Sequence, residues 1–134
     1  EAATLSIPKV KGKKGEIVPV QVEIRDAQGL AGLKLILVYN KEVLAYQSYK
    51  VSPLLKDKQV VVNSRDPGQL IFVMAGAEGI KEKEGTLVTF DFNAITAKVS
   101  KEASVLELVK VEMLDEKIKP VPFTIENGSF ELSE

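Results

Sequence analysis

The segment Gly29–Asn40 (GLAGLKLILVYN) most constrains the fold, because it is apolar on both faces of an extended chain. Side chains alternate along a strand, so Lys34, Ile36 and Val38 share one face while large apolar side chains fill the other. A sheet with one wet face would carry polar residues on that first set. The segment therefore predicts a strand that is either covered on both sides within the domain or leaves one face for a partner.

Length and charge limit the classes of function. A chain of 134 residues suits one domain with a sizeable core. Because the sequence lacks an initiator methionine, we expect residues 1–134 to be a single domain excised from a larger protein. With a net charge of −1 the chain lacks the excess of positive charge that is typical of proteins that bind nucleic acid or an anionic membrane. No apolar run approaches the ~20 residues that span a bilayer.

Residue types that carry most catalytic and metal chemistry are missing. The chain contains no cysteine and no histidine, which removes thiolate ligands, the commonest metal ligand and the commonest general base. The aspartates are scattered and none stands in a DxDxD loop, so no calcium site is expected. No motif marks a carboxylate pair or a Ser/Lys nucleophile. The sequence therefore predicts a protein that is not an enzyme and holds no cofactor.

Short strands separated by turns follow one another along the chain. Pro8 predicts an edge or a break in the first strand, Lys41–Ser52 reads as a connecting segment, and Asn127-Gly128 is a strong tight-turn signal. Ser104–Leu114 has some helical propensity, but its valine-rich pattern favours a strand. Eight or nine strands without a long helix predict an all-β sandwich. The expected strands are Leu5–Val10, Ile17–Arg25, Gly29–Asn40, Gln59–Asn63, Gln69–Ala75, Thr86–Ile95, Ser104–Leu114, Val121–Ile125 and Ser129–Leu132.

The order of several motifs resembles the cohesin module, the receptor domain of cellulosomal and related scaffold proteins. The matching pieces are Gly15–Val22 (GEIVPVQV), Gly29–Gly32 leading into LKLILVYN, Asn63–Gly79 (NSRDPGQLIFVMAGAEG), Gly85–Phe90 and Asn127–Phe130. Each motif alone is weak, but their order and spacing extend from Leu5 to Leu132. The resemblance implies a nine-stranded jelly-roll β-sandwich.

The resemblance also implies a function. Cohesins bind dockerins, whose EF-hand-like loops hold calcium, so the calcium would belong to the partner. It further implies an extracellular or cell-surface location. In the family the dockerin lies across one flat sheet face, and Ile36, Val38 and Val73 are expected to be central to it. The partner-binding residues that the resemblance implies are Gly32, Lys34, Ile36, Val38, Val60, Val62, Ser64, Ile71, Val73, Gly76 and Glu78, with Lys110 or Glu112 from the late strand.

The sequence departs from well-studied cellulosomal cohesins at polar positions. Gly32 and Lys34 stand where those carry Asn and Asp, and the acidic residue near Gly76 is missing. The resemblance therefore implies a more hydrophobic interface, as in the second major cohesin class. Three alternatives remain at this stage. In the first, the segment Lys41–Lys58 covers the apolar face; in the second, two copies pair through that face. In the third, the domain binds carbohydrate through Tyr46 and Tyr49, although it has no tryptophan and Tyr39 is expected to face the core.

Overall fold

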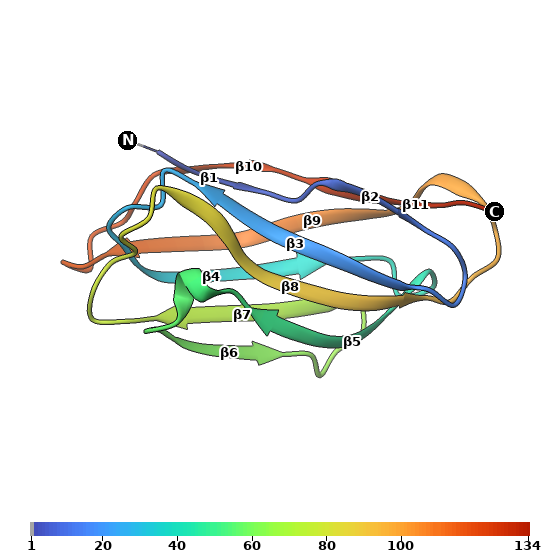
Figure 1. Ribbon diagram of the computed structural model, residues 1–134, viewed down its shortest axis with the longest axis horizontal. Coiled ribbons are helices and arrows are strands. Elements are labelled where there is room, and N and C mark those ends of the chain that lie inside the picture. The colour runs from blue at the N-terminus through green and yellow to red at the C-terminus, as the bar shows by residue number, and fades with distance from the viewer. Residues whose placement is uncertain (1) are drawn as a thin grey trace.

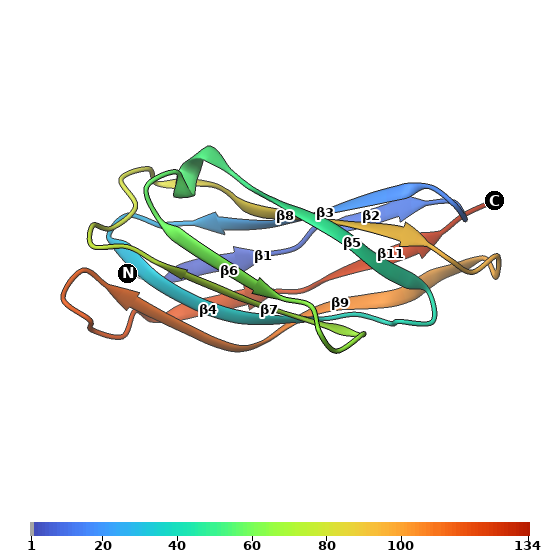
Figure 2. The ribbon, with the colours of Figure 1, turned by 90° about the horizontal axis from the view of Figure 1, so that it is seen from below.

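The structure is a computed structural model that describes residues 2–134 as two β-sheets packed face to face (Figures 1 and 2). The five-stranded sheet contains, in order, β10 (Phe123–Glu126), β1 (Ala3–Ser6), β3 (Ile17–Arg25), β8 (Glu84–Ala94) and β5 (Leu44–Val51). The six-stranded sheet contains β2 (Lys9–Gly12), β11 (Gly128–Leu132), β9 (Ser100–Asp115), β4 (Leu30–Val38), β7 (Gln69–Ala75) and β6 (Gln59–Asn63). The predicted all-β sandwich is confirmed.

Alternation along the strands builds the core between the two sheets. On β3, the residues Val18, Val20, Val22 and Ile24 are at most 1% exposed, while their neighbours along the strand face solvent. The strand β4 alternates in the same way around Leu35, and β8, which has buried side chains at consecutive positions, adds Phe90 to the same apolar cluster. Among residues 2–134 the helical structure is one short 3₁₀ turn, η1 (Pro53–Leu55), and no helix has the length and apolar character to cross a membrane.

The eleven strands among residues 2–134 exceed the predicted eight or nine because the first expected strand is divided in two and β5 forms where no strand is expected. The chain leaves the five-stranded sheet after Ser6 and enters the six-stranded sheet at Lys9, so Pro8 lies at a break, as predicted. The reading of Lys41–Ser52 as a connection is wrong, since most of it forms β5 at the edge of the five-stranded sheet. A bulge between Tyr46 and Ser48 interrupts its alternation, which hides the strand from a period-two search.

The prediction of a tight turn at Asn127-Gly128 is also wrong. These residues carry the chain from β10 in one sheet to β11 in the other. The Asn127 side chain accepts a hydrogen bond from the Leu108 N–H (2.9 Å). A Cβ atom on Gly128 would lie 2.5 Å from the carbonyl oxygen of Pro8, so glycine is needed where the two sheet crossings touch.

The long strand β9 settles the open choice between helix and strand for Ser104–Leu114. Apart from a bulge at Lys110, the segment is extended and pairs with β4 on one side and β11 on the other. Buried Leu106, Leu108 and Met113 supply core contacts that outweigh helical propensity. The strand prediction is confirmed, and β9 extends beyond it at the N-terminal end.

Candidate functional site

The side of β4 that points away from the core is open to solvent. We use "outer face" for the sides of β6, β7, β4 and β9 that point away from the five-stranded sheet; these four strands lie side by side in Figure 2. Leu35 and Leu37 of β4 are fully buried, whereas Ile36 and Val38 between and after them are only half-buried and Lys34 is exposed. The alternative in which Lys41–Lys58 covers this face is wrong, because β5 joins the opposite sheet and η1 packs against β8.

Strand register places the outward-facing apolar side chains in rows across the outer face. One row runs from Asn63 on β6 through Ile71 and Ile36 to Val109 on β9. Because side chains directly opposite in antiparallel strands are close neighbours, the three apolar side chains of this row lie next to one another, and the amide of Asn63 lies at the β6 end of the row.

A second row runs beside it. It begins with Val61 and Val73, which are 64% and 38% exposed, and continues to Lys34 and Glu112. The opposite charges of Lys34 and Glu112 face each other across β4 and β9, so the charged part of the row is electrically balanced. We call the apolar members of the two rows the "apolar strip": Val61, Val73, Ile71, Ile36 and Val109.

Most of the predicted partner-binding residues lie together on the outer face. Besides those in the two rows, Val38 lies at the C-terminal end of β4, opposite Gln69 and Glu107. Gly32 lies nearer the start of β4, opposite Ala75 and Leu114. A Cβ atom at Gly32 would meet only ordinary contacts, 3.6 Å or more away, so the backbone there is accessible.

The prediction that Val60 and Val62 point outward is wrong. They lie opposite Met74 and Phe72, which are at most 1% exposed, and both pack against the core. The central valine of the three, Val61, points outward instead. Three consecutive valines show no alternation, so the sequence alone leaves the facing of this strand undetermined.

Three further predicted residues lie at the margin of the outer face. Ser64 is exposed just beyond the end of β6. Gly76 follows β7, where its N–H donates to the Ala31 carbonyl oxygen (2.9 Å). The Lys58 side chain covers it, because a Cβ atom at Gly76 would lie 2.3 Å from Lys58 Cδ. Glu78 is exposed and lines a small hollow with lysines of the segment before β6.

A β-bulge determines which side chains of β9 point to the outer face. Val109 pairs with Ile36 and Glu112 with Lys34, so Lys110 and Val111 together oppose the single residue Leu35. Lys110 adopts φ 51° in the left-handed region and is exposed, whereas Val111 packs toward the core. The bulge reverses the alternation, which keeps both Val109 and Glu112 outward.

Sequence reasoning missed four outward residues. Leu114 (37% exposed) shares the facing of Glu112, and counting two positions from Glu112 would have found it. No sequence signal marks Val61 and Val109, because a triple valine and a bulge conceal their facing. Val105, 55% exposed on the same strand, extends the apolar character toward β11.

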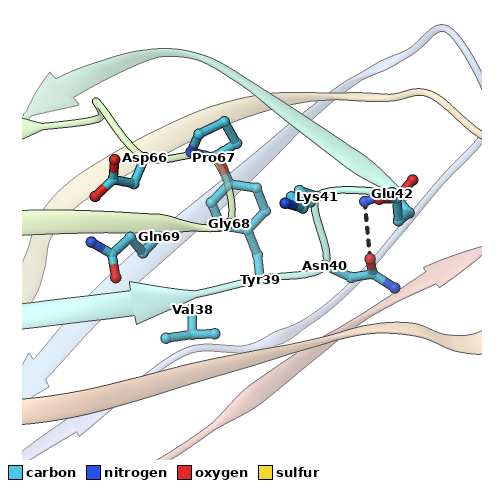
Figure 3. A pocket seen from close by; sticks show the side chains of 9 residues that line it. All are labelled: Val38, Tyr39, Asn40, Lys41, Glu42, Asp66, Pro67, Gly68 and Gln69. Atoms are coloured by element: carbon cyan, nitrogen blue, oxygen red, sulfur yellow. Dashed lines mark hydrogen bonds between the residues drawn. The ribbon is translucent and has the colours of Figure 1, made fainter.

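A hollow of about 410 Å³ adjoins the outer face at the end of β4 (Figure 3). Val38 and Gln69 belong to both, and the turn Asp66–Gly68 forms one wall. The Asn40 side chain accepts a hydrogen bond from the Glu42 N–H (2.9 Å), which fixes the opposite wall. The lining mixes carboxylates, a lysine, amides and a tyrosine.

Among residues 2–134 only Tyr49 of the three tyrosines is exposed (40%), so the tyrosines together do not form an extended platform for a sugar. Tyr39 is 7% exposed and faces the core, as predicted. Tyr46 is half-buried and meets Phe90 and Phe92 edge to face, with ring centroids 6.3 and 6.0 Å apart. Burial raises the pKa of Tyr46 above its ordinary value, with smaller contributions from Tyr49 and the neighbouring charges.

Among residues 2–134 no cluster of three potential metal-ligating side chains is found.

Comparisons with known proteins show which family and which solved structures this chain resembles. The family model described as Cohesin domain matches residues 3–132. No curated protein matches the chain at a significant level. A non-cellulosomal cohesin from the hyperthermophilic archaeon Archaeoglobus fulgidus is similar in structure, with a TM-score of 0.87 and 20% identity over 100% of this chain and 93% of that one.

Two further similar structures are of cohesins with a dockerin bound. The sixth cohesin of scaffoldin B from Acetivibrio cellulolyticus, in complex with the Cel5 dockerin, gives a TM-score of 0.88 and 19% identity over 99% of this chain and 100% of that one. A type I cohesin–dockerin complex from Clostridium thermocellum gives 0.86 and 14% identity over 98% and 94%. At these identities the likeness shows the fold.

Proposed function

Because this chain belongs to the cohesin family, whose model matches residues 3–132, we propose that it is a recognition module that binds a dockerin domain through its outer face. Members of the family are non-catalytic interaction modules, in agreement with the sequence prediction that the chain is not an enzyme. Structures similar to this chain include cohesins in complex with dockerins, which supports the choice of partner.

The apolar strip is the observation that carries the proposal. Outward-facing valine and isoleucine side chains, exposed at Val61 and Val73 and half-buried at the other positions, gather on four adjacent strands where one wet face of a sheet would carry polar residues. Paired strands hold these side chains in place before any partner arrives, so little conformational entropy is lost on docking. The strip would bury its apolar area against a partner helix at a gross gain of ~25 cal/mol per Å².

Charge has a secondary part in the proposed interface. Lys34 lies opposite Glu112, and the chain as a whole carries a net charge of −1. A balanced surface does not steer a charged partner over long distances, so association should depend only weakly on salt. Gly32 leaves an open, side-chain-free strip of backbone beside Leu114, where a partner helix can approach closely.

Three further parts of the proposal concern context. We assign the calcium requirement to the dockerin, because the cohesin side offers no clustered carboxylates among its described residues. We place the domain outside the cell or at its surface, where the cellulosomal relatives would act. We treat residues 1–134 as one independent domain, since both sheets share a single core.

Isothermal titration calorimetry against a panel of purified dockerins, with calcium and again with EDTA, tests the proposal. We expect one-to-one binding in calcium that disappears in EDTA. The melting temperature of this domain alone should be the same in both buffers, which assigns the metal to the partner. Absence of binding across the panel, or binding that survives EDTA, would contradict the proposed partner or the proposed place of the calcium.

A further inference from the structure

The turn that follows β9 holds a β-branched residue in the left-handed backbone conformation. Among residues 2–134 the non-glycine residues with positive φ are Asp26, Lys110 and Ile118. Aspartate tolerates this region and lysine is unbranched at Cβ, whereas the branched Cβ of Ile118 is crowded there. Ile118, at φ 62°, is therefore the clearest site of backbone strain in the described part of the chain.

The other residues of this turn suit its backbone. The Ile118 N–H donates to the Asp115 carbonyl oxygen (3.0 Å), which closes the turn. The Asp115 side chain accepts from the N–H groups of Lys117 (2.8 Å) and Lys119 (3.0 Å), and aspartate is a favoured first residue of such turns. Glycine is favoured at the left-handed position that ends a three-residue hairpin loop. Isoleucine at this position opposes the local structure, and proteins keep such conflicts mainly at functional sites.

Packing within the domain does not offset the strain. Ile118 is 76% exposed, the highest value among the exposed large hydrophobic side chains of residues 2–134. It belongs neither to the core cluster nor to the hydrophobic residues packed against that cluster. An apolar side chain that is held in a costly backbone conformation and left in water gains nothing within the domain, so its contacts are to be sought in a partner.

A third row of the outer face leads to this turn. It lies two residues along each strand from the row that contains Lys34. Its members are small or apolar and follow one another by strand pairing: Ala75, Gly32, Leu114 and Pro120. Asp115 pairs with Leu30, so the turn lies beside the start of β4, and it projects beyond the sandwich at the left of Figures 1 and 2. A partner helix that crosses the outer face over Gly32 would reach the turn next.

We propose that Ile118 is a second apolar anchor for the dockerin, beyond the end of the sheet, an inference that rests on the proposed function. The occupant is the partner of the apolar strip, because the third row connects the turn to the outer face without a charged residue between them. The hydrogen bonds to Asp115 hold the turn before binding, so docking costs little conformational entropy. The dockerin surface past the start of β4 is then apolar, and a dockerin with a charge there binds more weakly.

Two substitutions of Ile118 test the proposal, by calorimetric titration against the dockerin of the panel that wild-type protein binds most tightly. Ile118→Asn relaxes the backbone but removes the apolar side chain, so the melting temperature should rise while the Kd increases about tenfold. Ile118→Val keeps a β-branched apolar side chain and should bind within about threefold of wild type. Because stability and affinity change in opposite directions in Ile118→Asn, damage to the fold is excluded as the cause.

Two controls separate this inference from the proposed function. Ile17→Asn, at an exposed position on the opposite sheet, should bind like wild type, and Ile36→Asp should not bind. If Ile36→Asp abolishes binding while Ile118→Asn binds like wild type, or Ile118→Val binds as weakly as Ile118→Asn, only this inference is overturned. Wild-type protein that binds no dockerin overturns both. A wild-type dimer in sedimentation velocity that Ile118→Asn abolishes, with dockerin binding unchanged, would instead assign Ile118 to a contact between copies.

Discussion

Ile36 and Ile71 lie directly opposite each other across β4 and β7, and both point away from the core of the sandwich. Their chain neighbours Leu35 and Phe72 are also paired, and both are fully buried. Adjacent positions on the same two strands therefore serve different purposes. One set holds the sheets together, and the other is available to a partner. Substitutions can separate the two.

Replacement of Ile36 by aspartate should abolish dockerin binding and change stability little. The new carboxylate would have to lose its water inside an apolar interface, which we expect to weaken binding at least about 100-fold. In the free domain it stays hydrated, so unfolding free energy should change by about 1 kcal/mol or less. Calorimetric titration and urea unfolding measure the two effects.

The matched control is Leu35→Ala. It removes buried core volume and should cost about 2–5 kcal/mol of stability, while leaving the outer face unaltered. If Ile36→Asp were instead the more destabilising of the two, the outer face would be part of the core. Val38→Asp should behave like Ile36→Asp, with a smaller loss of binding at the end of the face.

Gly128→Ala should destabilise the domain strongly. The added Cβ would lie 2.5 Å from the carbonyl oxygen of Pro8 and 2.6 Å from that of Ile7, and backbone atoms cannot move aside cheaply. We expect a loss of about 2–4 kcal/mol in urea unfolding. Gly32→Ala is the comparison, because its Cβ meets nothing closer than 3.6 Å; its stability should equal that of wild type within about 0.5 kcal/mol.

Ile118→Asn should stabilise the domain. Ile118 is 76% exposed and adopts φ 62°, a conformation that is costly for a β-branched side chain and that asparagine tolerates. We expect a gain of about 1 kcal/mol in thermal or urea unfolding. Ile17→Asn, at an exposed position in a regular strand, should give no gain because asparagine disfavours strands. Equal effects at both sites would argue against backbone strain at Ile118.

Asp115 should contribute a pH-dependent part of the stability. Its side chain accepts hydrogen bonds from the N–H groups of Lys119 (3.0 Å) and Lys117 (2.8 Å), and chiefly the first holds the pKa of Asp115 below its usual value. A folded-state pKa below the unfolded one stabilises the protein above the unfolded pKa of about 3.9, and this is lost as pH falls through the folded value.

Asp115→Asn keeps an acceptor oxygen but cannot titrate, so it tests this linkage. The variant should be less stable than wild type near neutral pH, and the difference should shrink as pH falls below about 4. Urea unfolding at a series of pH values measures it. A difference that stays constant with pH would mean that the charge of Asp115 does not contribute.

The sequence predicts correctly which face of the sheet a side chain points to where apolar and other residues alternate without a break. On β4, leucines alternate with Lys34, Ile36 and Val38, and the structure turns the two sets to opposite faces as expected. On β6 the three valines are chemically identical, so hydrophobic pattern could not set their facing. Pairing with β7 sets it, because Phe72 and Met74 draw Val62 and Val60 inward. This information lies in tertiary contacts.

Irregular backbone explains the remaining differences. The bulge at Lys110 reverses the alternation of β9, and the one near Gln47 conceals β5. Asn127-Gly128 has the composition of a hairpin turn, yet it serves a sheet crossing, because Gly128 is required by its contact with Pro8. In each case one local signal is compatible with two backbone paths, and distant segments choose between them.

The parallel pairing of the first and last strands has a consequence for how the chain acquires this structure. Ala3 pairs with Phe123 and Lys9 with Ser129, so residues about as far apart as the chain allows must meet (Figure 1). Contacts this distant in sequence slow folding, since a long loop must close before they form. A growing polypeptide cannot complete the five-stranded sheet until β10 has been synthesised, nor the six-stranded sheet until β11 has been synthesised, and until then β1 lacks its neighbour β10 and β2 lacks its neighbour β11. We therefore expect slow folding that ends with the joining of the two ends.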